Sequence, residues 1–424
     1  MRFNAKAQRR KEGYKYLKVV VLGLGVSGRC AVAYLRERGD EVIGVDRMQT
    51  PLEGIQVVSD SSLPQLEGVE LLVKSPGIDS SHAWVQAAIE QDIPVVGEID
   101  LALAELEKRS KRVLAITGSN GKTTTTLLAA HLLNTSGTRA VATGNVGVPL
   151  LSQIDGEEEV FVVELSSFQL ERIVLRPIFE GAVILNITPN HLDRHPSFNA
   201  YMQAKLNIAL CLKERAPLYV TQQVLQACGS QIVAPLIKKV EPIWPLGYRD
   251  NHYRLFPHDV ENALAAFALT GVSLANLQKG IETFVRPPHR LELVREIAGI
   301  KYVNDSKATS VDAVIKALQA LEAPIILIAG GVDKGGAFSD WLFSCRGKVK
   351  SILALGEAAG RIERELGREM TVQKISSLQA GVRIATRQAK AGDTILLSPG
   401  CSSYDQFRDY QHRGETFTHL VREL

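Results

Sequence analysis

The sequence predicts an α/β protein with three domains, each built on a largely parallel sheet. Short apolar, β-branched runs that end in Gly, Ser, Asn or Asp alternate along the whole chain with helix-like stretches, a pattern typical of parallel sheets. The 424 residues allow about three domains of roughly 150 residues each. The clearest strand candidates are residues 18–22, 41–45, 71–74, 113–117, 160–165, 182–187, 325–329, 352–355 and 394–397.

Two breaks divide the chain into the predicted domains. The first lies at residues 96–100, where one β-α series ends and a new strand with its own glycine-rich loop soon follows. The second is the stiff run RPP at residues 286–288, which helix and strand interiors both avoid. We therefore predict domains at residues 1–99, 100–286 and 287–424. Because doubly wound sheets bind ligands at the carboxyl ends of their strands, the polar residues that follow each strand are the site candidates.

Composition favours small-molecule partners. The 49 basic and 46 acidic side chains leave a net charge of +3, too balanced for binding nucleic acid or an anionic membrane. No apolar run approaches the roughly 18 residues that cross a bilayer, and the basic residues 1–18 fit either a disordered tail or an amphipathic targeting segment. The five cysteines are scattered without CxxC spacing, so we expect neither a zinc site nor disulfides. We predict a cytoplasmic monomer without membrane insertion.

The run GLGVSG at residues 23–28 predicts a Rossmann-like first domain. It follows a strand candidate and opens a helix, and Asp46 closes the next strand about 20 residues later. The backbone amides of such a loop approach a diphosphate closely, so a nicotinamide dinucleotide, a nucleotide-sugar diphosphate and a purely structural turn all fit the pattern. We favour the nucleotide sugar. The candidate contacts are Val26, Ser27, Asp46, Ser75 and Gly77.

A second glycine loop, GSNGKT at residues 118–123, predicts a central domain of the P-loop ATPase type. Successive backbone amides would cradle phosphate oxygens, Lys122 would reach the β- and γ-phosphates, and Thr123 would bind magnesium. Two residues, rather than the usual four, separate the first glycine from Gly-Lys, which indicates a particular branch of P-loop proteins. A glycine-rich turn without nucleotide is the alternative. The ATP candidates here are Gly118, Ser119, Asn120, Gly121, Lys122, Thr123 and Thr124.

Metal-ligand candidates follow the next two strands. Glu164 ends one of them and offers the hard oxygen that Mg²⁺ prefers, while His191 lies in a loop after the other and could instead be a structural histidine. Lys205 projects from the apolar stripe of a helix that we expect Ser197 to cap. Because burying an unpaired ammonium is costly, this lysine either reaches outward or has its charge neutralised or modified. The expected stripe consists of Phe198, Met202, Lys205, Ala209 and Leu212.

These loops resemble those of the Mur ligase family, and the resemblance covers nearly the whole chain. Each motif alone is modest evidence, whereas their shared order and spacing are highly specific. The matching runs are GLGVSG at 23, TGSNGKTTT at 117, TGNVG at 143, VVELSSFQLE at 162, NITPNHLDRHP at 186, PPHRLE at 287, VNDSKATS at 303, AGGVDKGG at 329 and SPGCSSYDQF at 398.

The resemblance implies an ATP-dependent ligase that activates a carboxylate as an acyl phosphate. It further implies UDP-N-acetylmuramoyl-L-alanine and D-glutamate as substrates, two Mg²⁺ ions, and a place in the synthesis of peptidoglycan precursors. Three rivals stay open: a sister ligase with another amino acid or with folate, a nicotinamide dehydrogenase that uses the first glycine loop, and a non-catalytic or mechanochemical nucleotide-binding protein.

Roles carry over from the family position by position. Glu164 and His191 would bind magnesium together with Thr123, and Lys205 resembles the family's carbamylated lysine, in which a carbamate turns the cation into an oxygen ligand. Lys307 would lie near the transferred phosphate. The remaining contacts would be Asn145 for the UDP substrate, Asn262, Arg290 and Asp305 for the nucleotide, and Thr309, Lys334, Ser403 and Tyr410 for D-glutamate. The run RMQT at residues 47–50 does not align cleanly with the family's uracil-side Thr-Arg pair, and Arg47 is our candidate for a contact to UDP there.

Some C-terminal positions have simpler explanations or depart from the family pattern. Residues 305–307 could form a strand-end turn with a surface ion pair, and Lys334 beside Asp333 could be ordinary solvated charge. Tyr404 and Tyr410 stand where the family leads us to expect apolar or aromatic residues, and their hydroxyls add polarity to the predicted glutamate pocket.

Overall fold

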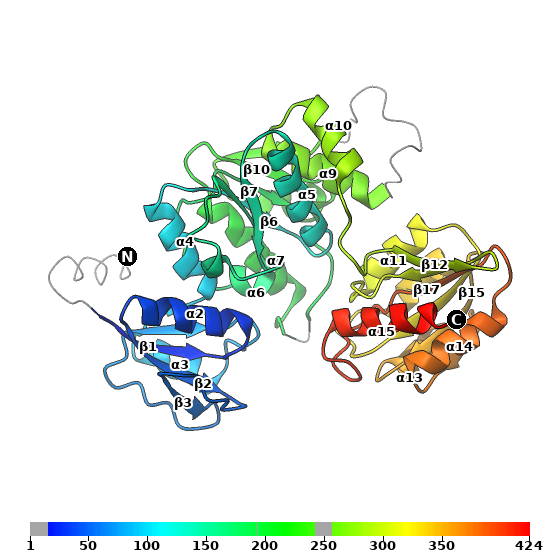
Figure 1. Ribbon diagram of the computed structural model, residues 1–424, viewed down its shortest axis with the longest axis horizontal. Coiled ribbons are helices and arrows are strands. Elements are labelled where there is room, and N and C mark those ends of the chain that lie inside the picture. The colour runs from blue at the N-terminus through cyan, green and yellow to red at the C-terminus, as the bar shows by residue number, and fades with distance from the viewer. Residues whose placement is uncertain (1–15, 193, 242–256) are drawn as a thin grey trace. The chain divides into compact units, whose positions relative to one another are not determined.

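The computed structural model describes residues 16–192, 194–241 and 257–424, and it confirms the α/β prediction with three sheets (Figure 1). The chain divides into two compact units: the first holds the first two sheets and the second holds the third sheet. In this part of the chain no helix combines the length and apolarity needed to cross a bilayer. The boundary that we place after residue 99 falls inside helix α4 (Glu98–Lys108).

The first sheet is fully parallel, with strand order β3-β2-β1-β4-β5. Strand order reverses between β1 and β4, so their carboxyl ends form the crevice where doubly wound sheets bind ligands. Val20 and Leu22 pack with Trp84 and Val85 of α3, which places that helix on one face. The elements are β1 (Lys18–Leu22), α2 (Val26–Glu37), β2 (Glu41–Asp46), β3 (Gln56–Ser59), β4 (Leu71–Lys74), α3 (Ala83–Glu90) and β5 (Val95–Val96).

The second sheet is also parallel, with order β11-β10-β9-β6-β8-β7, so the strand before the phosphate loop lies between two neighbours. Its inner strands are apolar because both of their faces are covered. The strands are β6 (Arg112–Thr117), β7 (Ala140–Gly144), β8 (Val160–Glu164), β9 (Gly181–Ile184), β10 (Pro217–Val220) and β11 (Leu236–Lys239). The further helices are α5 (Lys122–Thr135), α6 (Ser167–Leu170), α7 (Phe198–Leu206), α8 (Gln222–Cys228), α9 (Pro257–Thr270) and α10 (Leu274–Thr283).

The third sheet, of order β12-β13-β17-β14-β15-β16, is parallel except at one edge, where β12 runs antiparallel to β13. The sequence of β12 is alternating and its residues are largely exposed. This pattern identifies an edge strand only when its pairing with β13 is known. The strands are β12 (Glu292–Ile297), β13 (Ile300–Asn304), β14 (Ile325–Gly330), β15 (Val349–Leu355), β16 (Val372–Lys374) and β17 (Thr394–Leu397). The helices are α11 (Val311–Ala320), α12 (Leu342–Cys345), α13 (Ala359–Leu366), α14 (Leu378–Gln388) and α15 (Tyr410–Arg422).

The predicted helix over residues 198–212 is partly wrong. The α-helix ends at Leu206, and residues Asn207–Cys211 form a 3-10 turn. Phe198 is 36% exposed and so does not join the buried stripe, whereas Met202 and Ala209 are buried. A 3-10 turn is a common end of an α-helix, which accounts for the change after Leu206; the exposure of Phe198, at the first position of α7, is independent of it.

Candidate active site

The phosphate loop joins β6 to α5 and ends at Gly121, whose backbone is left-handed at φ 83°. A Cβ at this position would collide with Oδ1 of Asn262, because Asn262 on α9 packs against the loop and is only 6% exposed. Glycine is therefore required at position 121 for two reasons: the left-handed backbone disfavours other residues, and Asn262 leaves no room for a Cβ. Two of the predicted ATP contacts, Gly121 and Asn262, are brought together at the N-terminus of α5.

Two lysines converge on one carbonyl of this loop. Lys122 Nζ donates to Gly118 O and to Ser119 O, both at 3.0 Å, and Lys205 Nζ donates to Gly118 O at 2.8 Å. The Lys205 side chain is 1% exposed, so the outward-reaching alternative for it is wrong. Burial, and then the charge of Lys122, hold the pKa of Lys205 well below its ordinary value, while Glu164 acts in the opposite direction. The loop therefore holds two amine nitrogens, of Lys122 and Lys205, where phosphates would bind.

Glu164 supplies the opposing carboxylate at the end of β8. It lies in register with Ile116, next to the strand end from which the phosphate loop begins, and is 1% exposed. Its Oε1 accepts from Asn145 Nδ2 at 2.8 Å. Its Oε2 is buried and has no hydrogen-bond partner among the described residues. An unsatisfied buried carboxylate oxygen is costly, and a bound cation is one way to satisfy it.

The side chains near the phosphate loop fit Mg²⁺ better than they fit a metal ion whose ligands all come from protein side chains. Among the described residues no three His, Cys, Asp or Glu side chains gather in a way that could hold an ion. Magnesium commonly binds one or two carboxylates and completes its shell with water and substrate phosphates. Glu164 and the Thr123 hydroxyl at the start of α5 are compatible with that arrangement.

Asn186 holds the phosphate loop in place and was missed in the sequence. Its backbone oxygen accepts from Ser119 N and its Oδ1 accepts from Asn120 N, both at 2.8 Å, while its Nδ2 donates to Asn120 O at 3.1 Å. The residue is 9% exposed and follows β9 closely. The strand predicted at residues 182–187 included Asn186, whereas β9 ends at Ile184, so the sequence did not show that this polar residue follows a strand. Its backbone oxygen therefore holds Ser119 and its side chain holds Asn120, two of the predicted ATP contacts.

His191 lies in a segment that groups with the second compact unit, whereas Glu164 and Lys205 belong to the first. Its backbone is left-handed at φ 55°, and its amide donates to Asn190 Oδ1 at 3.0 Å. The structure therefore does not bring His191 together with the other two candidates within one unit, and its role as a metal ligand stays a prediction.

The first glycine loop is held by the two strand-end residues predicted beside it. Asp46 accepts from Leu24 N at 2.6 Å and from Met48 N at 2.9 Å, and Ser75 Oγ donates to Gly23 O at 2.7 Å. A Cβ at Gly28 would collide with the Gly23 carbonyl oxygen, so the start of α2 packs directly on the loop. Asp46 and Ser75 thus shape a loop at the switch point of the sheet.

The other candidates for the UDP substrate fall into three groups. Val26 and Ser27, at the exposed start of α2, and Gly77, also exposed, lie near the same strand ends. Arg47 is 87% exposed in its side chain, with Nε 3.9 Å from the carboxylate of Asp60. Asn145 lies instead directly after β7 of the second sheet, bonded to Glu164. Only the first group is gathered around the glycine loop.

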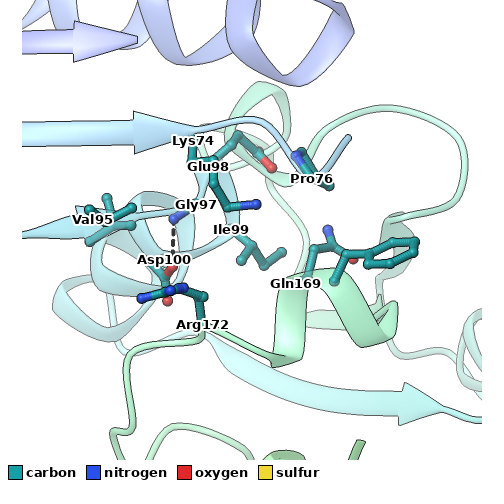
Figure 2. A pocket seen from close by; sticks show the side chains of 11 residues that line it. Lys74, Pro76, Val95, Gly97, Glu98, Ile99, Asp100, Gln169 and Arg172 are labelled. Carbon is teal, nitrogen blue, oxygen red and sulfur yellow. Dashed lines mark hydrogen bonds between the residues drawn. The ribbon is translucent and has the colours of Figure 1, made fainter. Parts of the chain in front are cut away.

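A small pocket lies where the first sheet leads into α4 (Figure 2). Glu98 accepts from Leu151 N at 2.7 Å, while Asp100 accepts from Gly97 N and Val174 N at 2.8 Å each. Burial raises the pKa of Glu98 to about 7 and that of Asp100 to about 6. These carboxyls fasten the start of α4 to neighbouring loops. The lining residues are Lys74, Pro76, Val95, Val96, Gly97, Glu98, Ile99, Asp100, Phe168, Gln169 and Arg172.

In the second unit, Asp305 follows β13 and is 7% exposed. Its Oδ2 accepts from Ser398 Oγ at 2.8 Å and its Oδ1 accepts from Leu291 N at 3.3 Å. Burial raises the pKa of Asp305 to about 7, and the charge of Arg290 acts against that rise. The predicted nucleotide contacts Arg290 and Asp305 are therefore close enough to interact, and Asp305 is not a surface turn residue.

Four of the residues predicted to meet D-glutamate or the transferred phosphate form two pairs. Lys334 Nζ donates to Thr309 Oγ1 at 3.3 Å, and Lys307 Nζ lies 3.7 Å from the ring centroid of Tyr410, in a cation–π contact. Asp333 is ion-paired with Arg361. Ser403 is 2% exposed, whereas Tyr404 is 75% exposed and turns toward solvent.

Comparisons with known proteins agree along the whole chain. Three family models match: "Mur ligase MurD-like, N-terminal domain" at residues 17–97, "Mur ligase middle domain" at 116–227 and "Mur ligase, glutamate ligase domain" at 289–401. A protein of Protochlamydia amoebophila (strain UWE25), named UDP-N-acetylmuramoylalanine--D-glutamate ligase, is 38% identical over 97% of this chain and 99% of its own. A protein of Chlamydia pneumoniae with the same name is 39% identical over 96% of this chain and 98% of its own.

Solved structures of low sequence identity share the fold. UDP-N-acetylmuramate-alanine ligase MurC from Thermotoga maritima has a TM-score of 0.60 at 16% identity, with 96% of this chain and 99% of that chain covered. MurF from Acinetobacter baumannii has a TM-score of 0.59 at 18% identity, with 97% and 92% covered.

Proposed function

Because this chain belongs to the Mur ligase family, we propose that it joins D-glutamate to UDP-N-acetylmuramoyl-L-alanine in an ATP-dependent step of peptidoglycan precursor synthesis. Relatives with the corresponding name match at 38–39% identity over nearly the full length of both chains, which supports the choice of substrates. The observation that carries the ATP-dependent step is the convergence of Lys122 and Lys205 on the phosphate loop, close to the buried carboxylate of Glu164.

The ATP phosphates would lie along the amides of residues 118–124, with Lys122 reaching the β- and γ-phosphates. Thr123, Glu164, His191 and the carbamate of Lys205 would hold two magnesium ions, which supply electrostatic neutralisation of phosphate charge when bound. Asn262, Arg290 and Asp305 would contact the rest of the nucleotide.

The UDP substrate would use the loop after β1, where the start of α2 offers unsatisfied backbone amides to a diphosphate. Asp46 and Ser75 keep that loop in shape, and Val26, Ser27, Arg47 and Gly77 would contribute the exposed contacts. Asn145, bonded to Glu164, would then meet the sugar-peptide end of the same substrate, near the phosphate loop.

D-glutamate carries two carboxylates, so its site needs several convergent donors. Lys334 with Thr309, the buried Ser403, and Tyr410 would supply them, and Lys307 would lie near the transferred phosphate. The terminal carboxylate of the UDP substrate would attack the γ-phosphate, forming an acyl phosphate and ADP. The amine of D-glutamate would then attack the acyl carbonyl and expel phosphate, with water excluded because it would hydrolyse the acyl phosphate.

The enzyme would act as a cytoplasmic monomer. All five cysteines are unpaired, four of them buried and one partly buried, which is compatible with a reducing compartment. The near balance of 49 basic and 46 acidic residues supports small molecules, rather than nucleic acid, as its partners.

One assay separates this function from its rivals: ADP release with UDP-N-acetylmuramoyl-L-alanine, comparing D-glutamate, L-glutamate and other amino acids. We expect release that depends on both substrates and prefers the D-isomer. A response to another amino acid would identify a sister ligase, NAD(P)H binding without ATP binding would favour a dehydrogenase, and ATP hydrolysis that ignores any acceptor would favour a mechanochemical ATPase.

The carbamate on Lys205 predicts dependence on carbon dioxide. Exhaustive decarbonation should lower kcat several-fold, and bicarbonate should restore it, because loss of the carbamate removes an oxygen ligand for magnesium. The carbamate N–H would still donate to Gly118 O, as the buried Lys205 Nζ does now. The measurement is initial-rate ADP release before and after bicarbonate addition. Lys205→Ala should be nearly inactive and unresponsive to bicarbonate. Indifference of the parent enzyme to carbon dioxide would identify an unmodified amine.

A further inference from the structure

Arg413 places a guanidinium inside the second compact unit, where it is 1% exposed on α15. Its Nε donates to Ser306 Oγ at 3.0 Å, its Nη2 to Ser306 O at 2.8 Å, and both Nη atoms to Cys401 O at 3.2 Å. Among the described residues no carboxylate forms an ion pair with it. Burial lowers the pKa of Arg413 to about 10, so the side chain is still cationic at neutral pH. The charges of Asp405 and Asp305 act on this cation without forming an ion pair, and a buried cation whose direct contacts are carbonyl and hydroxyl dipoles costs stability.

The acceptors of Arg413 lie on the two loops that hold predicted substrate contacts. Ser306 follows β13, between Asp305 and Lys307, and Cys401 follows β17, two residues before Ser403. Because β13 and β17 are parallel neighbours, these loops leave the same edge of the sheet side by side. Arg413 thus bridges the carboxyl ends of two adjacent strands, which is where doubly wound sheets build their ligand sites.

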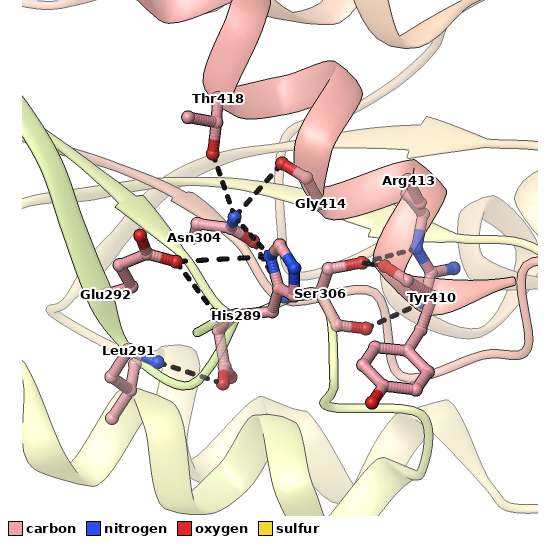
Figure 3. A network of polar contacts seen from close by, with 10 residues as sticks. His289, Leu291, Glu292, Asn304, Ser306, Tyr410, Arg413, Gly414 and Thr418 are labelled. Carbon is pink, nitrogen blue, oxygen red and sulfur yellow. Dashed lines mark hydrogen bonds and ion pairs between the residues drawn. The ribbon is translucent and has the colours of Figure 1, made fainter. Parts of the chain in front are cut away.

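The hydroxyl of Ser306 extends the bridge to a third segment. It accepts from Arg413 Nε and donates to the backbone oxygen of Tyr410 at 2.8 Å (Figure 3). The ring of Tyr410 lies against the ammonium group of Lys307. Each group in the chain Arg413–Ser306–Tyr410 is therefore held by the previous one, and its last member supports the lysine predicted to meet the transferred phosphate.

A second set of contacts prevents α15 from sliding to compensate for a change at Arg413. Asn304 Nδ2 lies 3.0 Å from Gly414 O and 2.9 Å from His289 Nδ1, and its Oδ1 accepts from Ser306 N at 3.1 Å (Figure 3). A Cβ at Gly414 would collide with the His289 ring. These contacts fix α15 against β13. The helix therefore cannot shift to restore the hydrogen bonds of a shorter side chain at position 413, and the oxygens that accept from Arg413 would be left unsatisfied.

The loop after β14 meets the same junction. Val332 and Ser402 exchange two backbone hydrogen bonds, at 2.9 and 3.0 Å, and a Cβ at Gly331 would lie 3.3 Å from Arg413 Nη1. Lys334 lies in the same loop, two residues after Val332. The three loops after β13, β14 and β17, which hold residues predicted to meet D-glutamate or the transferred phosphate, therefore meet around the guanidinium of Arg413.

We propose that Arg413 is a positioning residue for the amino-acid acceptor: by joining the loops after β13 and β17, it sets the geometry with which Ser403 and Tyr410 meet that substrate beside Lys307. This rests on the proposed function. Lysine cannot replace it, since a single ammonium on a shorter stem does not present the planar fork that reaches Ser306 and Cys401 together.

The test compares Arg413→Lys and Ser306→Ala with the parent in steady-state assays of ADP release. We expect Arg413→Lys to raise the KM for D-glutamate about tenfold or more, because small misplacements of substrate-positioning groups have large effects. Ser306→Ala removes the hydroxyl between Arg413 and Tyr410 and should raise the KM for D-glutamate about threefold to tenfold. The KM values for ATP and for UDP-N-acetylmuramoyl-L-alanine should stay within about twofold of the parent values, a split that general destabilisation would not produce.

Val421→Ala is the matched control. Val421 lies on the same helix, is fully buried, and packs in the core away from the three loops. It should lower the melting temperature without changing the KM for D-glutamate. If Arg413→Lys folds and its KM for D-glutamate is unchanged, the positioning role of Arg413 is overturned while the proposed function stands. If Arg413→Lys does not fold, an unchanged KM in Ser306→Ala has the same consequence. A parent enzyme that releases no ADP in response to D-glutamate would overturn the proposed function, and the inference with it.

Discussion

Replacing Lys122 with alanine is expected to lower the kcat for ADP release by at least about 100-fold to 1,000-fold, the effect of removing one preorganised donor from a developing negative charge. Lys122 opens α5 and its ammonium lies within 3.0 Å of the Gly118 and Ser119 carbonyls, so it is held over the phosphate loop. Phosphoryl transfer depends chiefly on positioning and charge neutralisation, which makes this cation hard to replace. The measurement is steady-state ADP release together with the melting temperature.

Lys111→Ala provides the matched control, because Lys111 also donates to backbone carbonyls, those of Gly156 and Glu158, but lies just before the amino end of β6. Both variants lose lysine-to-carbonyl hydrogen bonds, and both should keep a melting temperature close to that of the parent. Only Lys122→Ala should lose activity. Normal turnover in Lys122→Ala would contradict the assignment of the loop to ATP.

The sequence predicted the sheets and the strand-end candidates well because both follow from local pattern. Buried parallel strands read as apolar runs, and the first polar residue after each run marks the ligand-binding edge. Glu164 was found in this way, whereas the role of Asp305 was carried over from the family resemblance; both are buried at their strand ends. The chemistry of Glu164, a carboxylate that ends an apolar run, was visible without any knowledge of which strands were neighbours.

Residues that act through distant partners were not predictable. Asn186 bonds to the backbone of residues 119 and 120, and Arg413 bonds to Ser306, 107 positions earlier in the chain. Nothing in the local sequence of α15 distinguishes a buried arginine from a solvated one, because burial is decided by which loops the sheet order brings to the same edge. The antiparallel β12 was missed for a related reason: its direction follows from its pairing with β13 rather than from its own residues.

Replacing Glu164 with glutamine should reduce the apparent affinity for Mg²⁺ and lower kcat by at least about 100-fold, since an amide is a weak substitute for a carboxylate at a hard cation. The exchange is nearly isosteric and keeps an oxygen to accept from Asn145 Nδ2, so the local fold should persist. The group it removes is the buried Oε2, which has no hydrogen-bond partner among the residues that the structure describes. A magnesium titration of the ADP-release rate measures the effect.

A second readout does not depend on turnover. Ligands that bind only the folded state raise its stability by mass action, so a non-hydrolysable ATP analogue should raise the melting temperature of the parent more with Mg²⁺ than without it. Glu164→Gln should lose that magnesium-dependent increment. Glu98→Gln, which neutralises another buried carboxyl of the same unit, should retain it, because Glu98 bonds to Leu151 N rather than lying beside the phosphate loop. An equal magnesium increment in both variants would remove Glu164 from the metal site.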